Sequence, residues 1–164
     1  MPGEPFWYFA YASNLCCAIF AERRGMRALA SHRARLDGYR LTFTLPVGPG
    51  ERGVANVEPE EGAHVWGAAY LLAAEDCDRL DRTEGVHVGF YRRVPVDVHL
   101  DDGQVVAAYT YRSSWKTEGR KPSARYLGLM LDGAREHGLP AEYVAFLERL
   151  ERAVDERDAP PRKP

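Results

Sequence analysis

The chain lacks the motifs that mark metal sites and disulfide-stabilised folds. Its 164 residues include three cysteines, Cys16, Cys17 and Cys77, with no Cys-x-x-Cys pair among them and no His-Glu-x-x-His motif, so no metal site is predicted. Two of the cysteines are adjacent, and adjacent residues rarely close a disulfide without strain. The simplest interpretation is a protein with reduced cysteines in the cytoplasm.

Runs of like charge and long apolar segments are also missing. The 22 basic and 24 acidic residues are interspersed and give a net charge of −2, so neither nucleic acid nor an anionic membrane is an expected partner. The longest apolar stretch, 65–74, is far shorter than the about 20 residues that cross a bilayer. The residues around Glu4 lack the basic region that is typical of a signal peptide.

The residues that are present suit one packed domain. The apolar fraction is 45% and the charged fraction 28%, so we expect a single domain over 1–157 and a disordered polar tail over 158–164. Apolar alternation predicts strands, and apolar residues at helical spacing predict helices. The strands are expected over 6–11, 35–45, 54–58, 64–72, 92–100 and 104–112, and the helices over 13–24, 75–82, 123–137 and 140–150. The fold class is therefore α+β, with a curled or barrel-like sheet.

The first candidate functional segment is the turn Tyr11-Ala12-Ser13-Asn14, which follows the first strand. If a helix begins here, its free backbone N–H groups point beyond the end of the strand, where such groups attract carboxylates and oxyanions. Ser13 and Asn14 are equally typical of an ordinary helix cap. From the residues alone, both interpretations stay open.

Glu84 is the second candidate, because it ends a short predicted helix and is followed by Gly85. A carboxylate at a helix C-terminus faces the unfavourable end of the helix dipole. In a partly apolar cleft, desolvation would raise the pKa of Glu84 and make it a usable proton shuttle. The alternative is a solvated surface glutamate, one of many acidic residues in the chain.

Tyrosines form the third group. Four of the nine lie near these segments, and a tyrosine can line a small polar pocket with its ring and position a ligand with its hydroxyl. Core packing is the alternative for each one taken alone. The four are Tyr11, Tyr91, Tyr111 and Tyr126.

Four motifs in order resemble the γ-glutamylcyclotransferase family. Tyr8-Phe9-Ala10-Tyr11-Ala12-Ser13-Asn14-Leu15 is similar to its Y-F-A-Y-G-S-N-L signature, and Val65-Trp66-Gly67-Ala68 to its V-W-G-V strand. Leu80-Asp81 through Glu84-Gly85-Val86, then Tyr91, resembles its L-D-x-x-E-G-V segment and following tyrosine. The segment from Pro122 to Tyr143 resembles its C-terminal helices.

The resemblance implies a small mixed β-barrel flanked by helices. It implies that the α-amine of a small γ-glutamyl substrate attacks its own γ-carbonyl, forming 5-oxoproline and releasing an amino acid or amine. Glu84 would then be the general base and acid, Tyr11, Ala12, Ser13 and Asn14 the substrate-binding loop, and Tyr91, Tyr111 and Tyr126 the pocket tyrosines. This chemistry needs neither a metal nor an organic cofactor. A homodimer is a further possibility that the sequence leaves open.

The chain departs from the family pattern at Ala12, where the family has glycine. A methyl group there would interfere if the glycine adopts positive φ, and would narrow the pocket otherwise. A specialised enzyme that removes a γ-glutamyl protecting group from a pathway intermediate is one alternative, with the basic loop 116–121 meeting a carrier or phosphate. A non-catalytic γ-glutamyl-binding module is another. Glutathione degradation is less favoured, because relatives with that activity usually open with a loop closer to G-Y-G-S-L.

Overall fold

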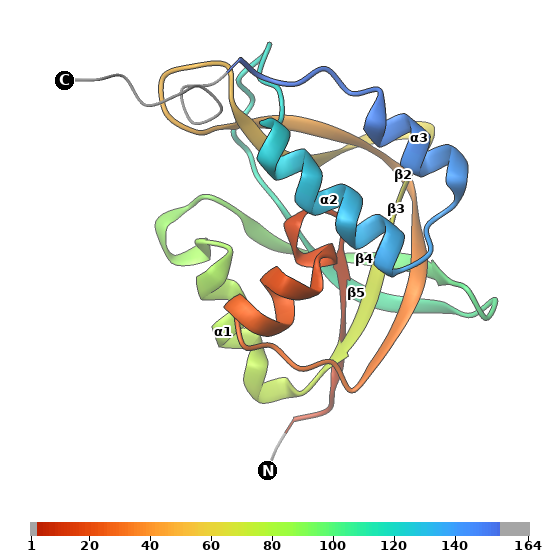
Figure 1. The fold of residues 1–164 in the computed structure, drawn as a ribbon. Coiled ribbons are helices and arrows are strands. Elements are labelled where there is room, and N and C mark those ends of the chain that lie inside the picture. Colours follow the sequence, from red (N-terminus) through yellow and green to blue (C-terminus); the bar gives the residue numbers. More distant parts are fainter. Residues whose placement is uncertain (1–2, 155–164) are drawn as a thin grey trace.

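The computed structural model describes residues 3–154 and has a closed five-stranded barrel at its centre (Figure 1). Around the barrel the strands follow the order β1-β3-β2-β4-β5. β1 pairs with β5 in parallel, and the other neighbours are antiparallel, so the barrel is mixed, as the family resemblance implies. The strands are β1 (Phe6–Ala10), β2 (Ala30–Pro46), β3 (Gly53–Leu72), β4 (Arg92–Leu100) and β5 (Val105–Arg112).

Within residues 3–154, three α-helices flank the barrel, which confirms the α+β class. They are α1 (Cys77–Thr83), α2 (Ala124–Glu136) and α3 (Ala141–Glu148). Figure 1 shows α2 and α3 running beside the long strands β2 and β3, with α1 at the opposite end of the molecule. The Ser123 side chain accepts a hydrogen bond from the Tyr126 N–H and caps α2, so the predicted start of that helix is confirmed.

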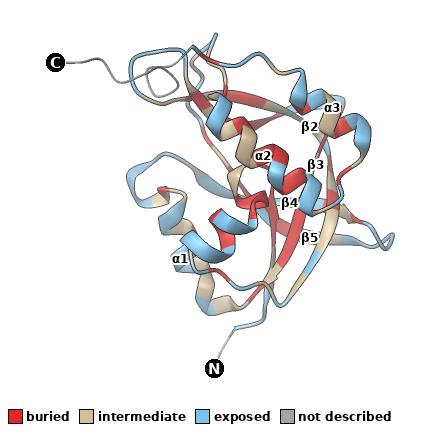
Figure 2. Ribbon diagram, in the orientation of Figure 1, coloured by how far each residue is buried: buried red, intermediate tan, exposed pale blue. Residues whose placement is uncertain are grey.

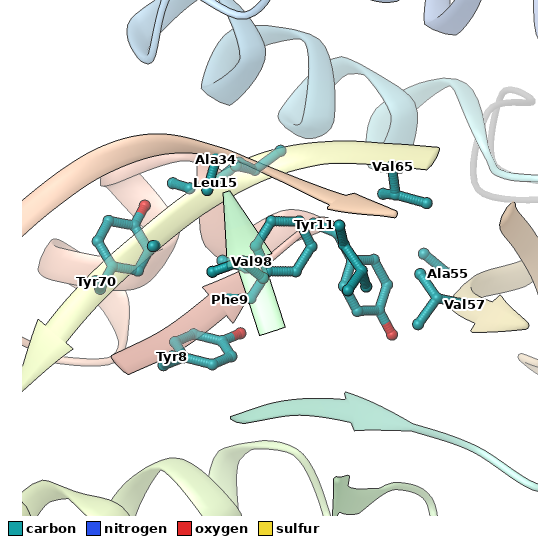
Figure 3. Packing of buried hydrophobic residues seen from close by; sticks show 14 of the residues in the cluster. Tyr8, Phe9, Tyr11, Leu15, Ala34, Ala55, Val57, Val65, Tyr70 and Val98 are labelled. Carbon is teal, nitrogen blue, oxygen red and sulfur yellow. The ribbon is translucent and has the colours of Figure 1, made fainter. Parts of the chain in front are cut away.

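The core fills the barrel and continues under α2. Figure 2 shows buried residues along the strands and on the inner face of α2. The buried residues of β1 and β3 come in consecutive runs, as expected where both faces of a strand are covered. Figure 3 labels ten of the core residues, namely Tyr8, Phe9, Tyr11, Leu15, Ala34, Ala55, Val57, Val65, Tyr70 and Val98.

The prediction of two strands over 54–58 and 64–72 is wrong, because β3 is one continuous strand of 20 residues. The intervening residues Pro59, Glu60 and Glu61 are polar or helix-breaking and exposed, which is typical of a loop. In the structure Pro59 pairs with Tyr39 and His64 with Asp37, and the pairing register of β2 with β3 shifts between these two pairs. A β-bulge therefore carries the strand across a segment that lacks apolar alternation.

The prediction of one regular helix over 13–24 is also wrong, because the segment forms helical turns of two other types. The segment forms a short 3-10 turn, Ser13–Leu15, followed by a π-helix, Ala18–Arg23. Neither Ser13 nor Asn14 caps a helix with its side chain, because the Asn14 amide is used elsewhere. The Arg24 N–H donates to the Ile19 carbonyl, five residues back, so the π-helix places one more residue in its turn than an α-helix would.

The remaining local predictions need little change. The helix expected over 75–82 is present as the 3-10 turn Ala74–Asp76 followed by α1, and Gly85 lies just after its end. The predicted polar tail, 158–164, lies outside the described residues. No helix within residues 3–154 combines the length and the apolar character needed to cross a bilayer.

Candidate active site

A cavity of about 720 Å³ opens where β1 ends, between the turn after β1, the end of α1 and the loop after β2. All eight candidate residues from the sequence line it, although they come from segments as far apart as the turn after β1 and α2. The structure therefore brings the candidates together around one space, while their individual roles remain predictions. They are Tyr11, Ala12, Ser13, Asn14, Glu84, Tyr91, Tyr111 and Tyr126.

Glu84 reaches the cavity because α1 stops at that point. It is the residue that follows the last turn of α1, and its N–H donates to the Leu80 carbonyl. Gly85 then takes a left-handed conformation with φ of 67°, which residues with a side chain rarely adopt. A Cβ at position 85 would lie 2.6 Å from the Phe90 ring, so there is no room for a side chain at this position.

The Glu84 carboxylate is held by an amide and a guanidinium. Asn14 Nδ2 donates to Glu84 Oε1 at 2.9 Å and to the Tyr8 hydroxyl at 2.8 Å. Arg24 Nη1 lies 3.4 Å from the same Oε1, and the two side chains are 21% and 15% exposed. Asn14 and Arg24 therefore both contact Oε1 of the carboxylate.

Opposing influences act on the pKa of Glu84. Burial raises it above its usual value, whereas the Arg24 charge and the hydrogen bond from Asn14 lower it. The burial effect is larger, so the pKa of Glu84 is raised overall. A carboxylate in this state is a stronger proton acceptor than one in water, which suits a general base.

Contacts from β3 and from the residue after α2 fix the position of the turn that follows β1. The Tyr70 hydroxyl donates to the Asn14 carbonyl at 2.9 Å, and His137 Nε2 lies 3.0 Å from the Leu15 carbonyl oxygen. The Leu15 N–H is used within the turn, by the Ala12 carbonyl. Both contacts hold the backbone that carries Asn14, so the position of the amide next to Glu84 is set by β3 and by the residue after α2.

The hydroxyl hydrogens of two candidate tyrosines are already engaged. The Tyr11 hydroxyl donates to the Tyr111 carbonyl at 2.6 Å, and the Tyr91 hydroxyl donates to the Ala55 carbonyl at 2.6 Å. Burial raises the pKa of both phenols well above the usual range, so they stay neutral. In this arrangement Tyr11 and Tyr91 can accept a hydrogen bond from a ligand, such as one from an ammonium group, but have no hydrogen to give.

The other two tyrosines are oriented by different groups. The Tyr111 hydroxyl donates to Asp81 Oδ1 at 2.5 Å, and Asp81 in turn lies 3.6 Å from Arg93. The Tyr126 hydroxyl accepts a hydrogen bond from the Ala55 N–H at 3.1 Å, which leaves its own hydrogen available. Tyr126 is therefore the candidate tyrosine best placed to donate to a ligand.

Sequence analysis missed three residues of this arrangement. Tyr8 lies in the quoted motif but has no polar neighbour in sequence, and Asp81 reads as an ordinary helix residue. Arg24 is the residue that directly follows the π-helix, and it contacts Glu84 from there. A π-turn has no recognised sequence signature, so no signal in the residues indicates Arg24, although such turns often occur at functional sites.

Ala12 adopts φ of −128°, so the alanine does not need the left-handed conformation that favours glycine. It is half-buried and lines the cavity. Its methyl group therefore narrows the space without straining the backbone. Within residues 3–154, no group of three His, Cys, Asp or Glu side chains is arranged to hold a metal.

Comparisons with known proteins relate nearly the whole chain to one group. The model of the AIG2-like family matches residues 64–147. The chain is 33% identical to the gamma-glutamylcyclotransferase of Bos taurus over 156 residues, covering 91% of this chain and 80% of the bovine protein. It is 32% identical to that of Homo sapiens, covering 90% and 80%. A solved structure named gamma-glutamyl cyclotransferase superposes with a TM-score of 0.81 at 28% identity, covering 93% of this chain and 92% of that one.

Proposed function

The chain belongs to the γ-glutamylcyclotransferase family, and from this premise we propose that the Glu84 cavity converts a γ-glutamyl amide into 5-oxoproline and a free amine. The observation that supports this assignment most is the contact between Asn14 Nδ2 and Glu84 Oε1 at 2.9 Å, inside a cavity that all the candidate residues line. This contact joins two of the four motifs that carry the family resemblance. The chain is accordingly an enzyme of the cyclotransferase type.

In the proposed reaction Glu84 moves protons. The α-ammonium of the substrate has a pKa near 8 and must lose a proton before its nitrogen can attack, and the raised pKa of Glu84 favours accepting that proton. The nitrogen then forms a bond to the γ-carbonyl carbon, and the bond between that carbon and the amide nitrogen breaks. Glu84 returns a proton to the departing nitrogen, which leaves as an amine.

The other residues bind and orient the substrate. Tyr11 and Tyr91, whose hydroxyl oxygens accept, suit the α-ammonium, and Tyr126 can donate to a developing oxyanion. The backbone of Ser13 and Asn14 is the proposed partner for the substrate α-carboxylate. Because ring closure is intramolecular, holding the substrate in a folded shape supplies much of the rate enhancement.

The test is product analysis. Purified protein is incubated with γ-glutamyl amino acids, γ-glutamyl amines and glutathione, and 5-oxoproline and the released amine are measured by mass spectrometry. We expect equal amounts of the two products from at least one γ-glutamyl amide. Glutamate in place of 5-oxoproline would indicate simple hydrolysis and contradict the proposal.

Replacing Arg24 with Gln is expected to shift the pH profile. The guanidinium charge lowers the pKa of Glu84, so without it burial acts with less opposition and that pKa rises further. A base works only when ionised, and the acid limb of log kcat/KM against pH should therefore move to higher pH. Arg82→Gln is the matched control, because Arg82 lines the same cavity but is not among the groups that shift the pKa of Glu84. An acid limb that stays in place in Arg24→Gln would contradict the assignment of Glu84 as the base.

Two alternatives are less supported. Ala12 was the only feature in favour of a non-catalytic binding module, and its φ of −128° removes the expected backbone strain. Tight binding of a γ-glutamyl compound without product over long incubation would favour that module. A specialised biosynthetic enzyme uses the same chemistry and differs only in its leaving group. The cytoplasmic setting, the single domain over 1–157 and the homodimer stay predictions.

A further inference from the structure

Asp81 contacts one of the side chains that line the Glu84 cavity. Among residues 3–154, Asp81 is not one of those that line the cavity itself, whereas Tyr111 is. The Tyr111 hydroxyl donates to Asp81 Oδ1 at 2.5 Å, and the Asp81 side chain is 21% exposed. Asp81 belongs to α1 and precedes Glu84 by three residues, so the end of this helix supplies both carboxylates. The proposed reaction uses Glu84 and assigns nothing to Asp81.

Arg93 holds Asp81 from the neighbouring strand. Arg93 of β4 and Tyr111 of β5 are directly paired in the antiparallel register, so their side chains lie on the same face of the sheet. Arg93 Nη2 lies 3.6 Å from Asp81 Oδ2. Arg93 also contacts the sulfur of Cys77 and lies over the Tyr109 ring, 5.2 Å from its centroid. These contacts keep the guanidinium group beside Asp81.

The hydrogen bond between Tyr111 and Asp81 can run in one direction only. An ionised carboxylate accepts hydrogen bonds and cannot donate them, so Tyr111 has to donate. Burial and this bond raise the pKa of the Tyr111 phenol, which therefore keeps its hydrogen. The Tyr111 oxygen is left with lone pairs and no hydrogen for a ligand. The same holds for Tyr11 and Tyr91, whose hydroxyls donate to backbone carbonyls.

Three hydroxyls that only accept, in one cavity with a carboxylate, suit a cationic ligand. An ammonium group has three hydrogens to donate and no lone pair. The α-ammonium is the cationic group of a γ-glutamyl compound, and it stays largely protonated at neutral pH. A hydroxyl that turned its hydrogen toward the cavity would meet the ammonium hydrogen to hydrogen. The direction of the Tyr111 hydrogen bond therefore decides whether Tyr111 attracts or repels this group.

We propose that Asp81 is a positioning residue, which makes Tyr111 an acceptor for the substrate α-ammonium by taking the hydrogen of the Tyr111 hydroxyl. Asp81 does not touch the substrate and acts through Tyr111. Arg93 holds the Asp81 carboxylate in place and balances its charge. This inference rests on the proposed function, because it assigns the α-ammonium of a γ-glutamyl substrate to the tyrosine side of the Glu84 cavity.

Asp81→Asn is expected to reverse this hydrogen bond with little change in size. The Arg93 guanidinium has only hydrogens to offer, so the amide oxygen of the new side chain should face Arg93. The amide NH₂ group then faces Tyr111 and donates to its oxygen, and the Tyr111 hydrogen turns toward the cavity. We expect weaker binding of ligands that carry an α-ammonium and little change for ligands that lack one.

The experiment compares two ligands on each protein. γ-Glutamyl-alanine and glutaryl-alanine differ only in the α-amino group, and calorimetry on Glu84→Gln protein measures both affinities without turnover. We expect γ-glutamyl-alanine to bind more tightly, and Asp81→Asn in this background to lower the affinity ratio about tenfold, as the loss of a hydrogen bond to a charged group does. A partly unfolded sample affects both ligands alike, so the ratio reports on recognition of the amino group.

Asp78→Asn is the matched control for Asp81→Asn. Asp78 lies in the same helix, is exposed and, among residues 3–154, is not one of those that line the cavity. The substitution makes the same change of charge without a contact to Tyr111. It should leave the affinity ratio unchanged.

Tyr111→Phe decides whether Asp81 acts through the hydroxyl. This substitution should lower the affinity ratio by itself, and adding Asp81→Asn to it should change the ratio no further. A second fall of the same size would show that Asp81 acts by its charge and not through Tyr111, which would overturn the proposal. An unchanged ratio in Asp81→Asn with Tyr111 intact, or no preference for γ-glutamyl-alanine in the Glu84→Gln protein, would overturn it as well.

Failure of the proposed function gives a different result. If wild-type protein forms no 5-oxoproline from any γ-glutamyl amide, the cyclotransferase proposal fails, while the affinity ratios still decide whether Asp81 controls recognition of the ammonium group. If the wild type forms 5-oxoproline and Asp81→Asn protein with Glu84 intact keeps the same KM for γ-glutamyl-alanine, only the role of Asp81 fails.

Discussion

Glu84→Gln protein is expected to lose about 10³-fold in kcat, the usual range for a positioned general acid-base group. Glutamine fills the same space and still reaches Asn14 and Arg24, but it cannot take a proton from the substrate α-ammonium. The loss should therefore appear in kcat for every substrate, with substrate binding changed much less. Steady-state formation of 5-oxoproline measures it.

The same substitution should not destabilise the fold. Burial raises the pKa of Glu84 in the folded protein above its value in the unfolded chain, so the folded state holds more protons between those two values. Stability contributed by Glu84 then falls as pH rises through that window, and at neutral pH the ionised carboxylate opposes folding. Thermal unfolding of Glu84→Gln at neutral pH should occur at the same temperature as the wild type or a higher one.

Glu75→Gln is the control for both measurements, because Glu75 is exposed and does not line the cavity. Its activity and unfolding temperature should match the wild type. A Glu84→Gln protein that folds normally and keeps most of its turnover would remove Glu84 from the mechanism.

Gly133→Ala is expected to destabilise the protein by about 2–3 kcal/mol, as overpacking of a close contact does. A Cβ at position 133 would lie 2.4 Å from Leu15 Cβ, 2.5 Å from the Leu15 carbonyl carbon and 2.7 Å from the Cys16 nitrogen. Two of these are backbone atoms, which cannot move aside as a flexible side chain can. The turn that carries Asn14 would have to shift, so kcat/KM should fall as well.

The matched control lies in the same helix. Gly128 of α2 has no heavy atom within 4 Å of an added Cβ, and alanine is the better helix former by about 0.5–1 kcal/mol. Gly128→Ala should therefore stabilise the protein, opposite in sign to Gly133→Ala. Chemical denaturation measures both. Two glycine substitutions with the same effect would show that α2 does not pack on the turn as closely as the structure has it.

The predictions from sequence were best where local pattern decides the outcome. Apolar alternation correctly predicts the strand β4, and apolar residues at helical spacing with a serine cap correctly predict the helix α2. In both, the pattern within the segment itself is enough to indicate the structure. Pattern failed along β3, where the exposed residues 59–61 stay within a strand because β2 pairs with β3 on both sides of them, at Pro59 and at His64. It also failed after β1, because the turn there is shaped by contacts with Gly133, Tyr70 and His137, which lie far away in the sequence.

The candidate site, too, was predicted from the sequence only in part. The motifs identify the residues around the cavity, and the structure brings them together. The contacts that set their chemistry are not readable from spacing. Asn14 was expected to act through its backbone or as a cap, yet its side chain donates to Glu84, and Arg24 arrives there through a π-turn. Such features depend on tertiary packing between segments that are far apart in the sequence.

The most direct test of the central claim asks whether the substrate's own amine is the nucleophile. A γ-glutamyl amide that the protein turns over is compared with the same compound carrying an acetyl group on its α-nitrogen, and the products are identified by mass spectrometry. Ring closure by the α-amine predicts 5-oxoproline from the free amine and no cleavage of the acetylated compound. Release of the leaving amine from both compounds at similar rates would contradict intramolecular cyclisation and indicate attack by water instead.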